Sequence, residues 1–136
     1  MKMRTFLQNK MWRDLAVEQL EAQGSVVHWK RLDDAKYDEQ LRLKLVEEAK
    51  EVIAAKSRQE LSVELADLLE MIEAVCAAHG ISMEEIENLR VKKRAERGGF
   101  EGRKYVTIAE HPEGSFGERY CLNDPDKYPE IEKPRP

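Results

Sequence analysis

The sequence predicts an all-α fold built on an antiparallel helix hairpin or four-helix bundle, with room for one or two short strands. Charged residues make up 37% of the 136 residues and aromatic residues only 7%, which is typical of helix-rich proteins and not of β-sandwiches or barrels. Helix start and stop signals recur along the chain at helical spacing. A chain of this length suits one domain and can form a core without disulfides.

The N-terminal part predicts a short helix followed by an extended segment. Residues 13–23 carry helix-forming side chains, and Gly24 supplies a common helix stop. The β-branched stretch "VVHW" at 26–29 favours a short strand. The stretch "KYVTI" at 104–108 predicts a second short strand for the same reason.

Two long helices are expected in the middle of the chain. Asp33 or Asp34 can cap a helix that runs to about Ala55. Ser57 with Glu60 then forms a capping box, which starts the chain again as another helix. Because only a short break separates these two helices, we expect them to fold back on each other as an antiparallel hairpin.

A further helix and a tail complete the expected order of elements. Gly80 ends the second long helix, and Ser82 with Glu85 forms another capping box for the next one. That helix ends near the paired glycines of "RGGF". Residues 109–136 contain all five prolines. The sequence therefore predicts a helical domain over 1–108 and an extended tail over 109–136.

Four carboxylates of the two long helices lie on or beside apolar faces. At about 100° per residue, Glu48 falls inside the apolar arc of the first long helix and Glu51 at its edge. Glu64 falls inside the arc of the second, and Asp67 at its border. A hairpin lets these four groups face one another. An unpaired buried carboxylate costs several kcal/mol, and a divalent cation offsets that cost. Oxygen ligands suit Mg²⁺, with Mn²⁺ as a substitute.

The acids also have other interpretations besides a magnesium site. Acid-rich helices commonly display their carboxylates as a solvated face, and this alternative stays open. A di-iron centre would use Glu-x-x-His pairs, but none of His28, His79 and His111 has an acid three residues before it. Zinc would need clustered Cys and His, which Cys76 and Cys121 do not supply.

Basic residues are concentrated beyond the acidic helices. Residues 45–87 contain eleven acids and three bases, whereas residues 90–104 contain seven bases and two acids. An acidic pocket that holds a metal beside basic side chains would suit a polyphosphate ligand. Bases near a helix C-terminus also favour the helix dipole, which is the ordinary alternative. The candidate phosphate-binding residues are Lys44, Lys93 and Arg97, with Lys10 and Arg13 as further candidates.

Charge and hydropathy exclude other classes of partner. The net charge of −4 is not that of a nucleic-acid-binding protein. No run of apolar residues is long enough to span a membrane, and the N-terminus does not have the pattern of a signal peptide. Two cysteines form no disulfide framework. We therefore expect a cytoplasmic protein with free thiols and no nucleic-acid or membrane partner.

At this level of detail the sequence resembles a known family. "KLVEEAKE", a 12-residue gap and "ELAD" match the ExxE–ExxD pattern of the MazG-like all-α nucleoside triphosphate pyrophosphohydrolases. The stretches "NKMWRDLAVEQLEAQG", "HGISMEE" and "KKRAERGGF" are similar to the phosphoribosyl-ATP pyrophosphohydrolase-like branch. The resemblance covers about residues 9–108. Leu15 and Val17 stand where that branch has Lys and Pro.

The resemblance implies a magnesium-dependent hydrolase that cleaves a nucleotide between its α and β phosphates and releases pyrophosphate. It implies that the metal ligands are Glu48, Glu51, Glu64 and Asp67, and that Glu48 and Glu47 are catalytic. The substrate would be a nucleoside triphosphate, including non-standard ones in a house-cleaning role, and the enzyme a homodimer or homotetramer. Two alternatives stay open: a non-catalytic helical module that binds metal or nucleotide, and true phosphoribosyl-ATP hydrolysis.

Overall fold

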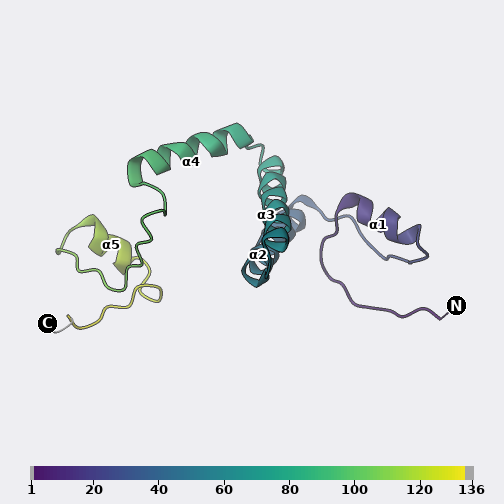
Figure 1. The fold of residues 1–136 in the computed structure, drawn as a ribbon, viewed down its shortest axis with the longest axis horizontal. Helices are drawn as coiled ribbons and strands as arrows, with labels where there is room; N and C mark the ends of the chain where they lie inside the picture. The colour runs from purple at the N-terminus through teal and green to yellow at the C-terminus, as the bar shows by residue number, and fades with distance from the viewer. Residues whose placement is uncertain (1, 134–136) are drawn as a thin grey trace. The chain divides into compact units, whose positions relative to one another are not determined.

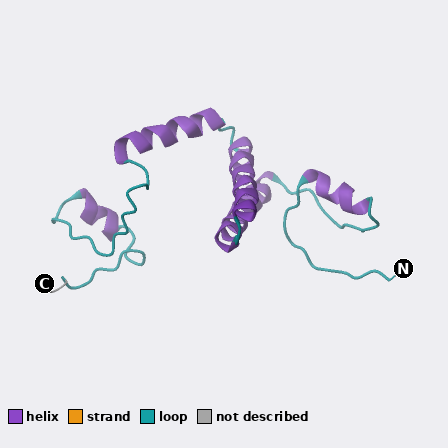
Figure 2. Ribbon diagram, in the orientation of Figure 1, coloured by secondary structure: helices purple, strands orange, loops and turns teal. Residues whose placement is uncertain are grey.

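The computed structural model describes residues 2–133, and this part of the chain forms helices and no strand (Figures 1 and 2). The chain divides into two compact units, Met1–Glu96 and Arg97–Pro136. The all-α class is confirmed. Within the described residues no helix combines the length and the apolar character needed to cross a bilayer. The helices are α1 Asp14–Glu21, α2 Asp34–Ala54, α3 Arg58–Ala78, α4 Met83–Arg97 and α5 Phe116–Leu122.

The first unit is organised by the predicted hairpin of α2 and α3, which pack side by side (Figure 1). Of the two candidate caps for α2, Asp33 takes the role, because its side chain accepts a hydrogen bond from the Lys36 backbone N–H at 2.8 Å. The side chain of Leu41 is only 2% exposed and is the best-buried group of the hairpin. Met71 and Cys76 of α3 complete the buried core.

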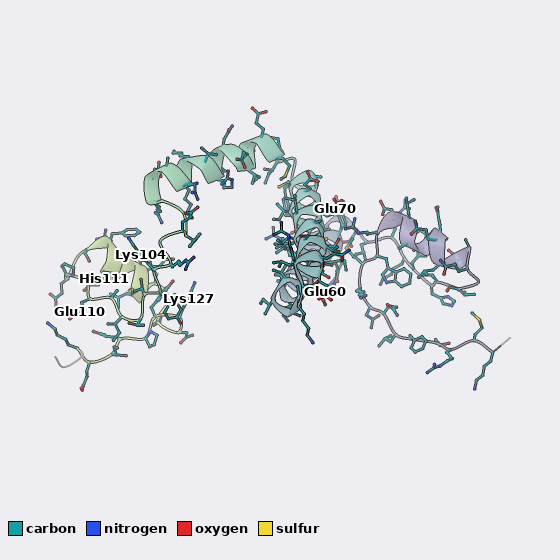
Figure 3. All side chains as sticks on the ribbon, in the orientation of Figure 1. Glu60, Glu70, Lys104, Glu110, His111 and Lys127 are labelled. Atoms are coloured by element: carbon teal, nitrogen blue, oxygen red, sulfur yellow. The ribbon has the colours of Figure 1, made fainter. Side chains whose placement is uncertain are left out.

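The turn between the two long helices is fixed by the predicted capping box. The Ser57 hydroxyl accepts a hydrogen bond from the Glu60 N–H at 3.0 Å, and the Glu60 carboxylate accepts one from the Lys56 N–H at 2.9 Å. Figure 3 labels Glu60 near the start of α3 and Glu70 farther along the same helix. These local bonds satisfy backbone donors that the start of α3 would otherwise leave unpaired.

The C-terminal end of α3 is formed by Gly80 and is held to α2 by a contact between His79 and Asp38. Gly80 has a φ of +66°, and the Ile81 N–H donates back to the Cys76 carbonyl at 2.9 Å, as in a Schellman motif. His79, which caps the helix, places its Nε2 2.7 Å from an Asp38 carboxylate oxygen on α2. The same carboxylate accepts hydrogen bonds from the Arg42 Nε. This cluster joins the two helices at the end opposite the turn.

Both predicted strands are absent from the described chain. Residues 26–29 and 104–108 are irregular, and the side chains of Val26 and Trp29 are well exposed. A strand needs a hydrogen-bonded neighbour, and no described segment pairs with either stretch. β-propensity alone therefore gave the wrong element at both places.

The second unit contains a helix that the prediction of an extended tail missed. The Ser115 hydroxyl accepts from the Glu118 N–H at 3.3 Å, while the Glu118 carboxylate accepts from the Gly114 N–H at 3.0 Å. This is a capping box at the start of α5. The ring of His111, labelled in Figure 3, lies so close to Gly117 that a Cβ there would overlap it. The boundary predicted at residue 108 stays a prediction.

The apolar arc predicted for α3 is only partly covered by α2. Cys76 is buried, but Leu61 is 39% exposed and Leu65 is 48% exposed. Leu69 on the neighbouring turn is also more than half exposed. Among the described helices, α2 is the one that packs extensively on α3. A continuous stretch of leucines along α3 is therefore left open to solvent in a single chain.

Candidate active site

Three of the four predicted metal ligands lie together in the hairpin. Glu48 comes from α2, and Glu64 and Asp67 come from α3. One carboxylate oxygen of each lies within 4.8 Å of the others, and all three side chains are half-buried. The fourth residue, Glu51, is exposed and lies outside this group. We refer to Glu48, Glu64 and Asp67 as the acidic triad.

The electrostatics of the triad favour a cation. The pKa of Glu64 is raised above its usual value, first because burial removes water from its carboxylate. The negative charges of Asp67, Glu51 and Glu48 raise it further, in that order. Glu51 thus acts on the triad through its charge although it lies outside the group. Three close carboxylates with no nitrogen or sulfur donor match the ligand set of a hard divalent ion.

Two lysines face the acidic side chains from α2 and from the N-terminal segment. Lys44 is only 18% exposed, and its Nζ lies 3.6 Å from a Glu48 oxygen and 3.7 Å from a Glu47 oxygen. The Nζ of Lys10 lies 3.6 Å from the other Glu47 oxygen. Glu47, predicted as catalytic, is thus held between two cations beside the triad.

Arg13 contacts the triad directly. Its Nη2 donates a hydrogen bond to the Asp67 Oδ1 at 2.8 Å. Arg13 is also the residue that precedes α1, so this bond ties the start of α1 to α3. Three of the five predicted phosphate-binding residues, Lys10, Arg13 and Lys44, therefore lie at the acids.

An open pocket of about 380 Å³ joins these charges to an apolar wall. Sequence reasoning did not assign most of this wall to the site. A signal was available for Ala16 and Leu20, because they are four residues apart and so share one face of α1, whereas Trp12 precedes this helix. The pocket is lined by Gln8, Lys10, Met11, Trp12, Arg13, Ala16, Leu20, Lys44, Glu48 and Asp67.

The two remaining basic candidates are not in this pocket. Lys93 lies exposed on α4 and is not among the lining residues. Arg97 is the first residue of the second unit, so the geometry of the first unit does not test it. Their role in phosphate binding stays a prediction.

A comparison with protein families identifies the family of the chain. Residues 18–94, more than half of the chain, match the family model of phosphoribosyl-ATP pyrophosphohydrolase. The chain belongs to this family. It is therefore a pyrophosphohydrolase, a hydrolase of acid anhydrides, and acts on a nucleotide. This confirms the resemblance found in the sequence and decides for an enzyme over a non-catalytic module.

The part of this enzyme that matches the family model includes the whole acidic triad and Lys44, but it begins after Arg13. The part of the pocket wall that precedes residue 18 is therefore outside the matched range. Neither a curated protein nor a solved structure matches the chain.

Proposed function

We propose that this family member is a magnesium-dependent enzyme that hydrolyses a nucleoside triphosphate between the α and β phosphates, giving a monophosphate and pyrophosphate. One observation carries the proposal. Two members of the acidic triad, Glu48 and Asp67, line one pocket together with three cationic side chains and an apolar wall. The three cations are Lys10, Arg13 and Lys44. Binding of a nucleoside triphosphate requires cationic side chains along the phosphates and an apolar surface against the base.

The triad would hold the magnesium ion, with Mn²⁺ as a substitute. Glu48, Glu64 and Asp67 offer carboxylate oxygens within 4.8 Å of one another, and Glu51 is the fourth proposed ligand. When bound, the ion would neutralise phosphate charge and lower the pKa of a water molecule. The raised pKa of Glu64 supports the proposal, since burial and then the charges of Asp67, Glu51 and Glu48 disfavour its negative form, which a cation would favour.

The basic residues would bind the phosphates and stabilise the charge that develops on the leaving pyrophosphate. Lys44 already lies beside Glu48 at 3.6 Å, so a phosphate bound near the triad comes within reach of its ammonium group. Lys93 and Arg97 are proposed to add to this charge. Trp12 on the pocket wall offers an aromatic face on which a base can stack.

Glu47 is proposed to accept the proton of the attacking water, and Glu48 to serve the same reaction through the metal site. The water oxygen forms a bond to the α phosphorus, the bond from that phosphorus to the bridging oxygen breaks, and pyrophosphate leaves. The ion pairs with Lys10 and Lys44 keep Glu47 oriented beside the triad. A base in this role needs such a fixed position close to the reacting water.

Phosphoribosyl-ATP is the second candidate substrate, and the description of the matching family favours it. This molecule also presents a triphosphate, so cleavage at the same α–β bond would use the same residues. A house-cleaning enzyme would instead prefer non-standard triphosphates.

We also propose that the enzyme works as a homodimer or homotetramer. Leu61, Leu65 and Leu69 form the exposed stretch of α3 that α2 does not cover. A contiguous apolar surface of this kind marks an interface in soluble proteins. Burial of this stretch against a second hairpin would complete a four-helix core.

The experiment is a pyrophosphate-release screen with standard triphosphates, damaged triphosphates and phosphoribosyl-ATP, each with Mg²⁺ and with a chelator. We expect equal amounts of monophosphate and pyrophosphate, and only with Mg²⁺. Replacement of Glu47 by Gln should reduce the rate by about 10²–10⁴-fold, as for loss of a general base. Release of orthophosphate, or turnover that survives chelation, would contradict the proposal.

A further inference from the structure

Arg13 makes a contact with the acidic triad that a bound metal would have to share or replace. Its guanidinium Nη2 donates a hydrogen bond of 2.8 Å to the Oδ1 of Asp67, a member of the acidic triad. The pair is partly open to solvent, with the Arg13 side chain 62% exposed and that of Asp67 34% exposed. An exposed pair of this kind is weak and is easily exchanged for another partner.

A divalent cation at the triad and the Arg13 guanidinium would meet on one carboxylate. A single and a double positive charge a few ångströms apart repel each other even in water. The Asp67 carboxylate would then be drawn toward the cation, and its attraction for Arg13 would fall. Arg13 would have to move away from the metal or find a new anion.

The pocket offers a place for such an anion. Arg13 lines it together with Lys10 and Lys44, so a phosphate chain bound there would lie within reach of all three cations. The guanidinium is planar and can donate two parallel hydrogen bonds to a phosphate as well as to a carboxylate. The same side chain can therefore serve Asp67 before the metal binds and the substrate afterwards.

We infer that Arg13 stands in for the metal at Asp67 in the free protein and transfers to the phosphates of the substrate once the metal is bound. The inference rests on the metal site of the proposed function. Arg13 then opposes metal binding in the absence of nucleotide and favours nucleotide binding in its presence. The N-terminal segment thereby couples the two ligands, so that the charged pocket is completed only when both are present.

The chain offers a matched control for a test of this coupling. Arg42 is 63% exposed and pairs with Asp38, which is 32% exposed, so the two arginine–aspartate pairs are exposed to nearly the same extent. Arg42 does not line the pocket. Arg13→Gln and Arg42→Gln therefore remove the same charge and the same type of bond at two different places.

The experiment measures Mn²⁺ binding without nucleotide, from the electron paramagnetic resonance signal of the free ion. R13Q should bind Mn²⁺ about three- to tenfold more tightly than the wild type, because a repelling charge has been removed. R42Q should stay within about twofold, since distant charges are screened. Arg13→Lys keeps the charge and should stay near the wild type.

A second measurement follows the nonhydrolysable probe α,β-methylene-ATP at saturating Mn²⁺ by equilibrium dialysis. R13Q should bind it about tenfold more weakly, as expected for a lost charge-assisted pair, R13K less so, and R42Q as the wild type. Mn²⁺ binding that is unchanged or weaker in R13Q would overturn the inference, even if the wild type binds the metal. If E64Q binds Mn²⁺ as tightly as the wild type does, the metal site of the proposed function is overturned, and the inference with it.

Discussion

Glu64 is the residue whose replacement separates a metal site from a structural cluster. Among the described residues it is the member of the triad with no ion pair, since Glu48 pairs with Lys44 and Asp67 with Arg13. Glu64→Gln keeps the size of the side chain and removes a charge that the neighbouring carboxylates oppose. Without metal we therefore expect the Arg13–Asp67 and Lys44–Glu48 pairs to persist in E64Q. The Tm of metal-free E64Q should then be roughly 2–6 °C above that of the wild type.

With magnesium the wild type should have the higher Tm and E64Q the lower one, the reverse of the order without metal. At about 100 times the Kd, a ligand that binds only the folded state stabilises it by about 2.7 kcal/mol, or roughly 10 °C for a chain of this size. If loss of the Glu64 ligand weakens binding about a hundredfold, the remaining gain at the same concentration is about 0.4 kcal/mol, or roughly 1–2 °C. The assay is thermal unfolding followed by circular dichroism, with a magnesium titration and with a chelator.

Glu70 provides the matched control for this prediction. Glu70 is labelled on the same helix in Figure 3, its side chain is exposed, and it is not a member of the triad. Glu70→Gln should leave both the metal-free Tm and the magnesium-induced shift close to the wild-type values. A clear drop in Tm of metal-free E64Q would refute the reasoning, because it would mean that Glu64 makes a stabilising contact. So would a magnesium-induced shift of wild-type size in E64Q.

Three further predictions concern the hairpin. Leu41→Ala should destabilise the fold by about 2–5 kcal/mol in urea unfolding, and a smaller loss would show a poorly packed core. Leu65→Lys should convert the proposed oligomer to a monomer in light scattering, and an intact oligomer would exclude this face. The hydrogen bonds from His79 and then Arg42 lower the pKa of Asp38, so stability present at neutral pH should be lost below about pH 4. Asp38→Asn should flatten this dependence of Tm on pH, and an equally steep curve would contradict it.

Local capping signals explain why so much of the fold could be predicted. The capping box of Ser57 and Glu60 and the helix end at Gly80 involve only residues that are neighbours in the chain. Such signals can therefore be recognised in the sequence. The box of Ser115 and Glu118 is the same signal, but the proline-rich composition around it led to the prediction of an extended tail. The two strands failed because strand formation depends on a partner that the sequence of one segment does not contain.

The site could be predicted in part for a related reason. Helical angle gives the direction of a side chain, and it predicted that Glu48, Glu64 and Asp67 face one another, as they do in the hairpin. It placed Glu51 at the edge of an arc, where small differences in packing decide exposure, and the side chain is exposed. The contact of Arg13 with Asp67 spans 54 residues, and no local pattern predicts such a tertiary contact.

The most direct test of the central claim is a crystal structure of the protein grown with Mn²⁺, with the ion located from its anomalous scattering. The account predicts a peak bonded to carboxylate oxygens of Glu48, Glu64 and Asp67. A well-ordered map in which these side chains contact only water or protein, with no anomalous peak among them, would contradict it.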